Sequence, residues 1–231
     1  MSVAEHSIAG AEARGRGFMA SSVGRKVVMA VTGVILFGFA TVHMLGNMQA
    51  YLGSEAFNEY AKFLHHMVHG AGIWIFRAVL LTAAILHLWA AASLTKANMA
   101  ARPVGYRLQQ TSASTWASRT MRWSGVILAV FIVYHLLHLT FGSVHPAFDP
   151  ANPHQNFVKG FQVPAVAAFY IVAQLCLGLH MWHGVWSTTQ SLGLVHPRYD
   201  ALRRHIATGL TLVVVAGNIS FPIAVLTGLI H

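Results

Sequence analysis

The chain has 231 residues, of which 55% are hydrophobic and only 9% are charged. This composition excludes an ordinary soluble domain and indicates an integral membrane protein, folded as one unit over residues 1–231. The formal net charge is +9, a size that is also compatible with nucleic-acid binding. The placement of the basic residues therefore has to decide between the two interpretations.

Five apolar segments each have about the 20 residues that a helix needs to cross the hydrocarbon core. They are rich in Gly, Ala, Ser and Thr, which suits close helix packing in lipid, and they lack the alternation of a barrel strand. The sequence therefore predicts an all-α bundle of five transmembrane helices. The expected spans are about 26–48, 73–95, 123–143, 164–188 and 205–230.

Basic residues gather in alternate connections of this bundle. The connections on the side opposite the N-terminus contain only Lys62 and Lys159, and Arg77 lies just within the second span. By the positive-inside rule the N-terminus, with residues 1–24, is expected in the cytoplasm and the C-terminus outside, so a nucleic-acid surface is the poorer explanation. Because residues 1–24 lack a small-residue cleavage pattern, we expect no secretory signal and favour a prokaryotic inner membrane. The basic residues on the side of the N-terminus are Arg14, Arg16, Arg25, Lys26, Lys96, Arg102, Arg107, Arg119, Arg122, Arg198, Arg203 and Arg204.

Four histidines, His43, His87, His135 and His180, lie inside four different spans. An ionisable ring is costly in hydrocarbon, so each is a candidate functional residue. At about 1.5 Å per residue, His43 lies roughly 25 Å beyond Lys26 and His135 roughly 20 Å beyond Arg122, which places both in the outer half. His87 and His180 lie roughly 12–14 Å from the inner boundary. Depth therefore predicts two pairs, His43 with His135 and His87 with His180.

Two imidazoles on one iron are typical of a low-spin electron-transfer haem, so the pairs predict two haems b at different depths. Small neighbours of the histidines are expected to leave room for a flat macrocycle. They are Ala83, Ala84, Ala90 and Ala91 around His87, with Gly46 and Gly184 beside His43 and His180. His138 and His183 lie one turn beyond His135 and His180, and spacing alone lets either replace its neighbour or bind a propionate or a quinone.

Residues near the span ends are candidates for the polar edges of these sites. For the inner haem propionates we consider Ser22, Arg25, Lys26 and Arg122, with topogenic charge and a helix N-cap at Ser22 as the simpler explanation. A quinone needs a hydrogen-bond donor and a protonatable group. The candidates are Glu55, Glu59, His65, His66 and His69 outside, and Ser22, Arg25 and Trp116 inside. The single cysteine, Cys176, is interpreted as a small buried side chain.

Four stretches of the chain resemble a known family. They are SSVGRKVVMAVTGVILFGFATVHMLGN (21–47), GSEAFNEYAKFL (53–64), RWSGVILAVFIVYHLLH (122–138) and FYIVAQLCLGLHMWHGVWSTTQSLG (169–193). Their sequences are similar to those of the cytochrome b membrane-anchor subunit of succinate dehydrogenase and fumarate reductase, in its five-helix, two-haem form. The resemblance implies that His180 and His135 are the ligands in their helices. It also implies His87 with His180 for the inner haem and His43 with His135 for the outer one.

The resemblance further implies a flavoprotein subunit with FAD and an iron–sulfur subunit, both on the cytoplasmic face. A subunit of this kind would exchange their electrons with a membrane quinone, either menaquinone or ubiquinone. Association of such complexes into a higher oligomer stays open. The chain has neither a dinucleotide fingerprint nor a cysteine cluster, so that chemistry must belong to partners.

Two alternatives stand beside this interpretation. One is the haem-b anchor of a hydrogenase or formate dehydrogenase, which shares intramembrane histidines. The other is a haem-free transporter whose histidines bind protons or a divalent ion. The spans contain no carboxylate and no evident inverted repeat, which weighs against the transporter.

Overall fold

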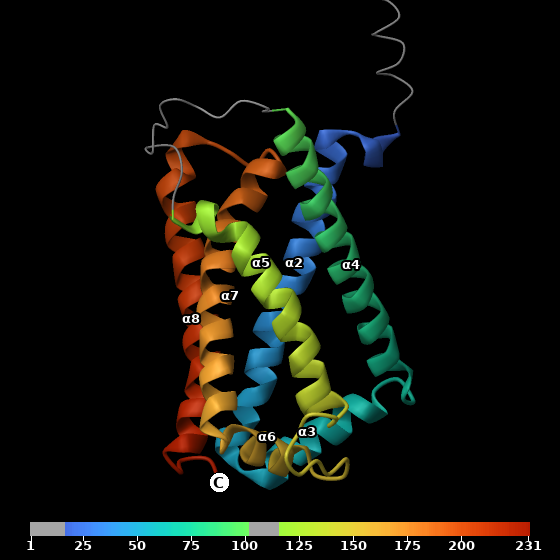
Figure 1. The fold of residues 1–231 in the computed structure, drawn as a ribbon, viewed down its shortest axis with the longest axis vertical. Helices are drawn as coiled ribbons and strands as arrows, with labels where there is room; N and C mark the ends of the chain where they lie inside the picture. Colours follow the sequence, from blue (N-terminus) through green and yellow to red (C-terminus); the bar gives the residue numbers. More distant parts are fainter. Residues whose placement is uncertain (1–16, 102–115) are drawn as a thin grey trace, which may run out of the picture.

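The computed structural model describes residues 17–101 and 116–231, with side chains from residue 120 onward in the second range. Within these ranges the fold is all-α, and five helices are long and apolar enough to cross a membrane. They run side by side in alternating directions (Figure 1). The predicted five-helix class is confirmed, whereas the orientation of the termini stays a prediction. The five are α2 (Ser22–Asn47), α4 (Ala71–Ala100), α5 (Trp116–His135), α7 (Pro164–Ser191) and α8 (Asp200–Leu226).

Local sequence explains where these helices begin and end. The hydroxyl of Ser21 accepts a hydrogen bond of 2.9 Å from the backbone N–H of Gly24 and so caps α2, which satisfies one of the free N–H groups of the first turn. The expected cap at Ser22 is therefore wrong by one residue. Helix α7 starts at Pro164, whose missing N–H costs nothing in a first turn. Helix α5 continues into a π-helical turn, Leu136–Thr140.

Two shorter helices that the sequence reasoning placed in loops close one end of the bundle. They are α3 (Ser54–His66) and α6 (Pro153–Phe161), and they lie side by side across the ends of the long helices (Figure 1). The Asn58 side chain joins them: its amide donates to Asn152 Oδ1 at 3.1 Å, and its oxygen accepts from the His154 backbone N–H at 3.0 Å. We call this the α3/α6 end and the other one the basic end.

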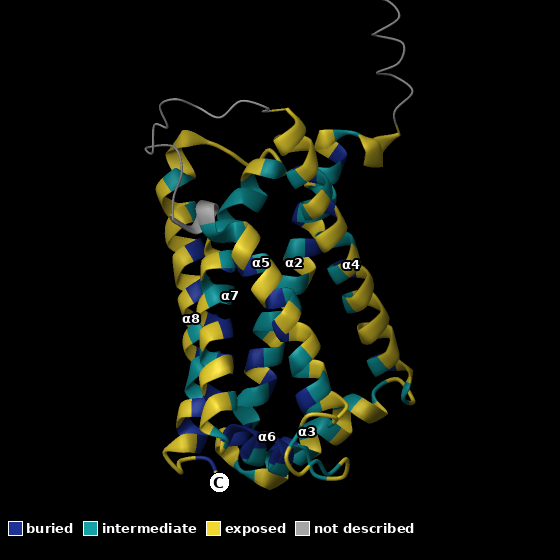
Figure 2. Cartoon of the chain, in the orientation of Figure 1, coloured by how far each residue is buried: buried dark blue, intermediate teal, exposed yellow. Residues whose placement is uncertain are grey.

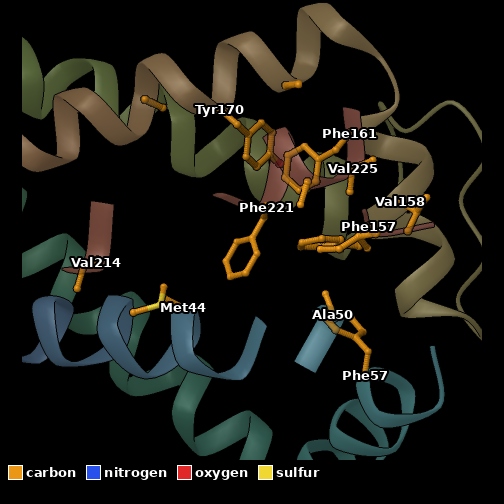
Figure 3. Close-up of a cluster of buried hydrophobic side chains, with 14 of the residues drawn as sticks. Met44, Ala50, Phe57, Phe157, Val158, Phe161, Tyr170, Val214, Phe221 and Val225 are labelled. Atoms are coloured by element: carbon orange, nitrogen blue, oxygen red, sulfur yellow. The ribbon is translucent and has the colours of Figure 1, made fainter. Parts of the chain in front are cut away.

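Burial is uneven along the bundle. The long helices carry many exposed residues (Figure 2). Large apolar side chains are common among them, as expected for surfaces solvated by lipid tails. Aromatic side chains of α6, α7 and α8 gather at the α3/α6 end (Figure 3), where the Phe161 and Tyr170 rings lie 4.9 Å apart and edge to face. This packing fixes the α7 segment around Tyr170, which contacts the functional residues described next.

Candidate functional site

The structure brings the four intramembrane histidines together in the two pairs that depth predicts. The ring centroids of His43 (α2) and His135 (α5) lie 5.8 Å apart, with their planes at 82°. Those of His87 (α4) and His180 (α7) lie 6.2 Å apart, with their planes at 60°. Each pair therefore joins two different helices, and the four side chains form two separate sites.

Both separations suit a metal ion held between two imidazoles. With a nitrogen–metal bond of about 2.0 Å and a ring centroid about 1.1 Å behind each nitrogen, two opposed rings have centroids about 6 Å apart. No group of three or more His, Cys, Asp or Glu residues converges anywhere in the described ranges. Neither pair thus gains a third protein ligand there, which fits a metal whose other positions are filled by a macrocycle.

Hydrogen bonds determine which nitrogen of His87 is free. Its Nδ1 lies 3.2 Å from the carbonyl oxygen of Met29 and 3.1 Å from Oγ1 of Thr32. The carbonyl can only accept, and the Thr32 hydroxyl already donates to the Val28 carbonyl at 2.7 Å, so Nδ1 carries the proton. The lone pair of His87 is therefore on Nε2, the usual arrangement of a metal-ligating histidine.

His180 has a similar environment on the opposite side of the pair. Its Nδ1 lies 3.3 Å from Oγ of Ser124, whose own hydrogen goes to the Met121 carbonyl at 3.1 Å. Ser124 therefore accepts from Nδ1–H, and Nε2 again keeps the lone pair. One hydroxyl from α2 and one from α5 thus orient the two rings of this pair.

The contacts of the His43–His135 pair are different. Nδ1 of His135 lies 3.3 Å from the Tyr170 hydroxyl, which also lies 2.9 Å from Nδ1 of His138. His43 stacks on Phe39 at 5.2 Å, and its Nε2 lies 3.4 Å from the Asn47 amide nitrogen. His43 is the one member of the four whose polar contact uses Nε2 rather than Nδ1.

The neighbouring histidines, His138 and His183, lie outside the two pairs. His138 is fully buried and stacks on His145 and Tyr134, with centroids 5.0 and 5.5 Å away. His183 is half-buried, and its ring lies edge-on to Trp186 at 6.3 Å. The geometry thus favours His135 and His180 as the ligands, in agreement with the resemblance.

Several polar candidates at the span ends have structural partners instead. Arg25 donates to the backbone carbonyls of Ala20, Ser21 and Ser93. Glu59 forms an exposed ion pair with Lys62 at 2.6 Å, and His65 and His66 bond the carbonyls one turn earlier in α3. Glu55 lies in the first turn of α3, and His69 in the turn that follows it. These α3 residues do not converge on either pair.

The remaining end residues are less informative. Ser22 and Lys26 lie in the first turns of α2, and Arg122 lies in α5, all at the basic end. The Trp116 side chain and residues Arg14, Arg16, Arg102 and Arg107 lie outside the described part of the chain, as does the side chain of Arg119.

One small-residue expectation is wrong. A Cβ at Gly46 would lie 2.5 Å from the Tyr60 hydroxyl oxygen, so the missing side chain makes room for Tyr60 of α3 rather than for a macrocycle. Gly184, by contrast, has open space beside it, since a Cβ there would meet no atom within 4 Å. Gly46 therefore serves the packing of α3 on α2.

Two further donors lie at the basic end, Arg203 and Trp186, and the sequence alone does not distinguish Arg203 from the other basic residues there. The Arg203 side chain is only 11% exposed and forms an ion pair with Asp200 at 3.5 Å, but among the described residues its three nitrogens make no hydrogen bond. The Trp186 indole N–H is likewise buried without an acceptor in the part of the chain that the structure describes. Buried donors without acceptors are costly, so this arrangement fits a bound carboxylate. Arg203 shares one helix face with buried Ala207 and Thr211, a spacing of four residues that the sequence already contains.

Five membrane-length helices that bring paired histidines together at two depths define a multi-pass membrane protein of the cytochrome type. Residues 99–219, slightly more than half of the chain, match the family described as succinate dehydrogenase/fumarate reductase transmembrane subunit. The chain belongs to this family, so the inferred resemblance is confirmed and the protein is a membrane subunit of that complex.

A curated relative agrees with this assignment. The chain is 27% identical over 187 residues to the succinate dehydrogenase cytochrome b558 subunit of Bacillus subtilis (strain 168), a match that covers 80% of this chain and 86% of the relative. No solved structure matches the chain.

Proposed function

We propose that this chain binds two haems b and passes electrons between an iron–sulfur subunit and a membrane quinone. The carrying observation is the pair of opposed imidazoles at each of two depths, with centroids 5.8 and 6.2 Å apart. The relative from Bacillus subtilis is named a cytochrome b558 subunit, which supports haem b as the group. The inner haem belongs to His87 and His180, and the outer haem to His43 and His135.

Haem would supply one-electron oxidation and reduction of iron, and two histidines holding that iron would leave it no position for oxygen. The protein orients these ligands through Thr32, Ser124 and the Met29 carbonyl at the inner pair. We assign the Arg203 and Trp186 donors, which make no hydrogen bond to the described residues, to an inner propionate. Trp186 lies six residues beyond His180, or about 9 Å along the helix towards the basic end.

The partners follow from the charges of the two ends. The described basic residues of the basic end are Arg25, Lys26, Lys96, Arg122, Arg198, Arg203 and Arg204. We propose that this end faces the cytoplasm of a prokaryote and docks the flavoprotein and iron–sulfur subunits, which carry FAD and the clusters. Electrons then enter or leave next to the inner haem.

The quinone, menaquinone or ubiquinone, belongs to the same proposal. Its outer candidates remain Glu55, Glu59, His65, His66 and His69, and its inner ones Ser22, Arg25 and Trp116. The exposed α3 residues would have to exchange contacts within their own helix for a quinone carbonyl, whereas Arg25 would have to leave three backbone carbonyls.

One experiment separates this function from its alternatives. The complex that co-purifies with the chain is oxidised, and the absorbance of reduced haem b is followed after adding succinate, hydrogen or formate in separate samples. Reduction by succinate alone supports the proposal. A haem that succinate does not reduce, or a folded complex without haem, would contradict it.

A further inference from the structure

The Tyr170 hydroxyl lies between His135, the last residue of α5, and His138 in the π-helical turn that follows it. It is 3.3 Å from Nδ1 of His135 and 2.9 Å from Nδ1 of His138. The Tyr170 side chain is 5% exposed, and its ring meets Phe131 and Phe161 edge to face at 5.0 and 4.9 Å. This packing fixes the Tyr170 ring, which Figure 3 shows beside Phe161.

The Tyr170 hydroxyl has a single hydrogen, so it can donate to only one of the two histidines and must accept from the other. If His135 binds iron through Nε2, its hydrogen must be on Nδ1, and Tyr170 must accept from it. The Tyr170 hydrogen is then free for Nδ1 of His138. The bonds therefore run from His135 to Tyr170 to His138, and iron at His135 fixes the tautomer of both histidines.

The series of hydrogen bonds ends at His138, which has no acceptor for its own hydrogen among the described residues. With Nδ1 accepting, the hydrogen of His138 is on Nε2, an atom that is buried without a partner in the described structure. His145 cannot accept from it, because its Nε2–H donates to the Asn156 carbonyl at 2.8 Å and its Nδ1 accepts from the Ala147 N–H. Gly160 packs against this edge, where a Cβ would lie 2.9 Å from Nε2. A fully buried imidazole with one unpaired nitrogen is thus kept beside Tyr170 at a cost in stability.

We propose that Tyr170 is a positioning residue for the outer haem. This inference rests on the proposed function. Its hydroxyl orients the His135 ring and, polarised by the bond it gives to His138, draws on the Nδ1 hydrogen of His135. A stronger bond at Nδ1 makes the imidazole a better electron donor to iron, which favours the oxidised state. At the inner pair the matching hydroxyls of Thr32 and Ser124 donate to carbonyls of their own helices instead.

The test compares two tyrosines of one aromatic cluster. Tyr134 lies 6.2 Å from Tyr170, ring to ring, and stacks on His138, but no hydrogen bond of its hydroxyl is present in the described ranges. Tyr170→Phe and Tyr134→Phe are made in the whole complex, and both haems are titrated with a reductant while their low-spin EPR signals are recorded. A His135→Ala sample identifies the outer haem's signals.

We expect Tyr170→Phe to keep two haems, to raise the midpoint potential of the outer one and to shift its EPR signal. The inner haem should not change, and Tyr134→Phe should change neither. His138→Leu should raise the outer potential by less, because it removes only the polarising partner. This variant also carries the test if Tyr170→Phe fails to assemble.

An unchanged outer potential in an assembled Tyr170→Phe complex overturns the inference. So does an equal shift in both tyrosine variants, and so does an unchanged potential in His138→Leu if that variant alone assembles. A wild-type complex with no haem at the outer pair would instead contradict the proposed function.

Discussion

The two histidine pairs have similar ring separations, 5.8 and 6.2 Å. They differ in the hydrogen-bond partners of their imidazole nitrogens. At the His87–His180 pair, which the proposal places on the inner side, hydroxyls of α2 and α5 and a backbone carbonyl contact the two Nδ1 atoms. At the outer pair one tyrosine serves His135 together with His138, and His43 contacts Asn47 through Nε2. Identical ligand sets can therefore have different properties, because hydrogen bonds to the ligands tune a bound metal.

The largest expected effect comes from removing a ligand. His180→Ala or His87→Ala should abolish the inner haem and keep the outer one, and His135→Ala or His43→Ala should do the reverse, since one imidazole cannot replace a bis-histidine site. Pyridine haemochrome assays and difference spectra measure the loss. His183→Ala is the matched control and should retain two haems. If replacing His138 removed a haem and replacing His135 did not, the assignment in α5 would be wrong.

A smaller effect is expected from the hydroxyls of the inner pair. Thr32→Val removes an acceptor of His87 and should weaken inner haem binding by about 10–100-fold, the usual cost of losing such a partner. Haem retention during dilution with apomyoglobin as an acceptor measures it. Thr41→Val is the control on the same helix, since among the described residues its hydroxyl bonds the Phe37 carbonyl and no histidine. Equal haem loss from both variants would show that Thr32 acts on helix packing alone.

Arg203 tests the link between the basic end and the inner pair. Arg203→Gln removes a buried positive charge from the proposed propionate site, so the inner midpoint potential should fall while the outer one stays constant. Arg204→Gln is the neighbouring control, because Arg204 is 65% exposed and already paired with Asp200 at 2.6 Å. A redox titration in which both variants behave alike would remove Arg203 from the haem site.

The smallest expected effect is a pH dependence at the α3/α6 end. Burial, with a further contribution from nearby His231, lowers the pKa of His154 below its usual value. The unfolded chain then binds the proton more readily, so stability should fall as the pH drops below about 6.5. Thermal unfolding of the complex between pH 5 and 7.5 should show this slope, and His154→Gln should reduce it. The exposed His66 provides the control variant, and a slope that His154→Gln leaves unchanged would contradict the assignment.

The sequence predicts the features that depend on the length of the apolar segments and on the helical rise per residue. Five apolar runs predict five helices, and 1.5 Å per residue predicts which histidines meet. Helices α3 and α6 were missed because short amphipathic segments are below the length of a span. Their packing on the bundle also explains Gly46, which receives Tyr60.

The contacts of the ligands could not be predicted in the same way. Thr32, Ser124 and Tyr170 act across helix interfaces, and their partners depend on helix rotation, which composition does not specify. Arg203 is one of the twelve basic residues that the positive-inside rule explains equally well, so the sequence gives no reason to assign it a binding role. Its spacing of four from Ala207 could have placed it on the buried face of α8.

The most direct test of the account is the number of haems in the purified chain, measured as haem b per polypeptide together with a redox titration. Two low-spin haems per chain, lost one at a time in the His180→Ala and His135→Ala variants, are the predicted result. A single haem in the wild-type chain would mean that one histidine pair is structural, and none would contradict the central claim.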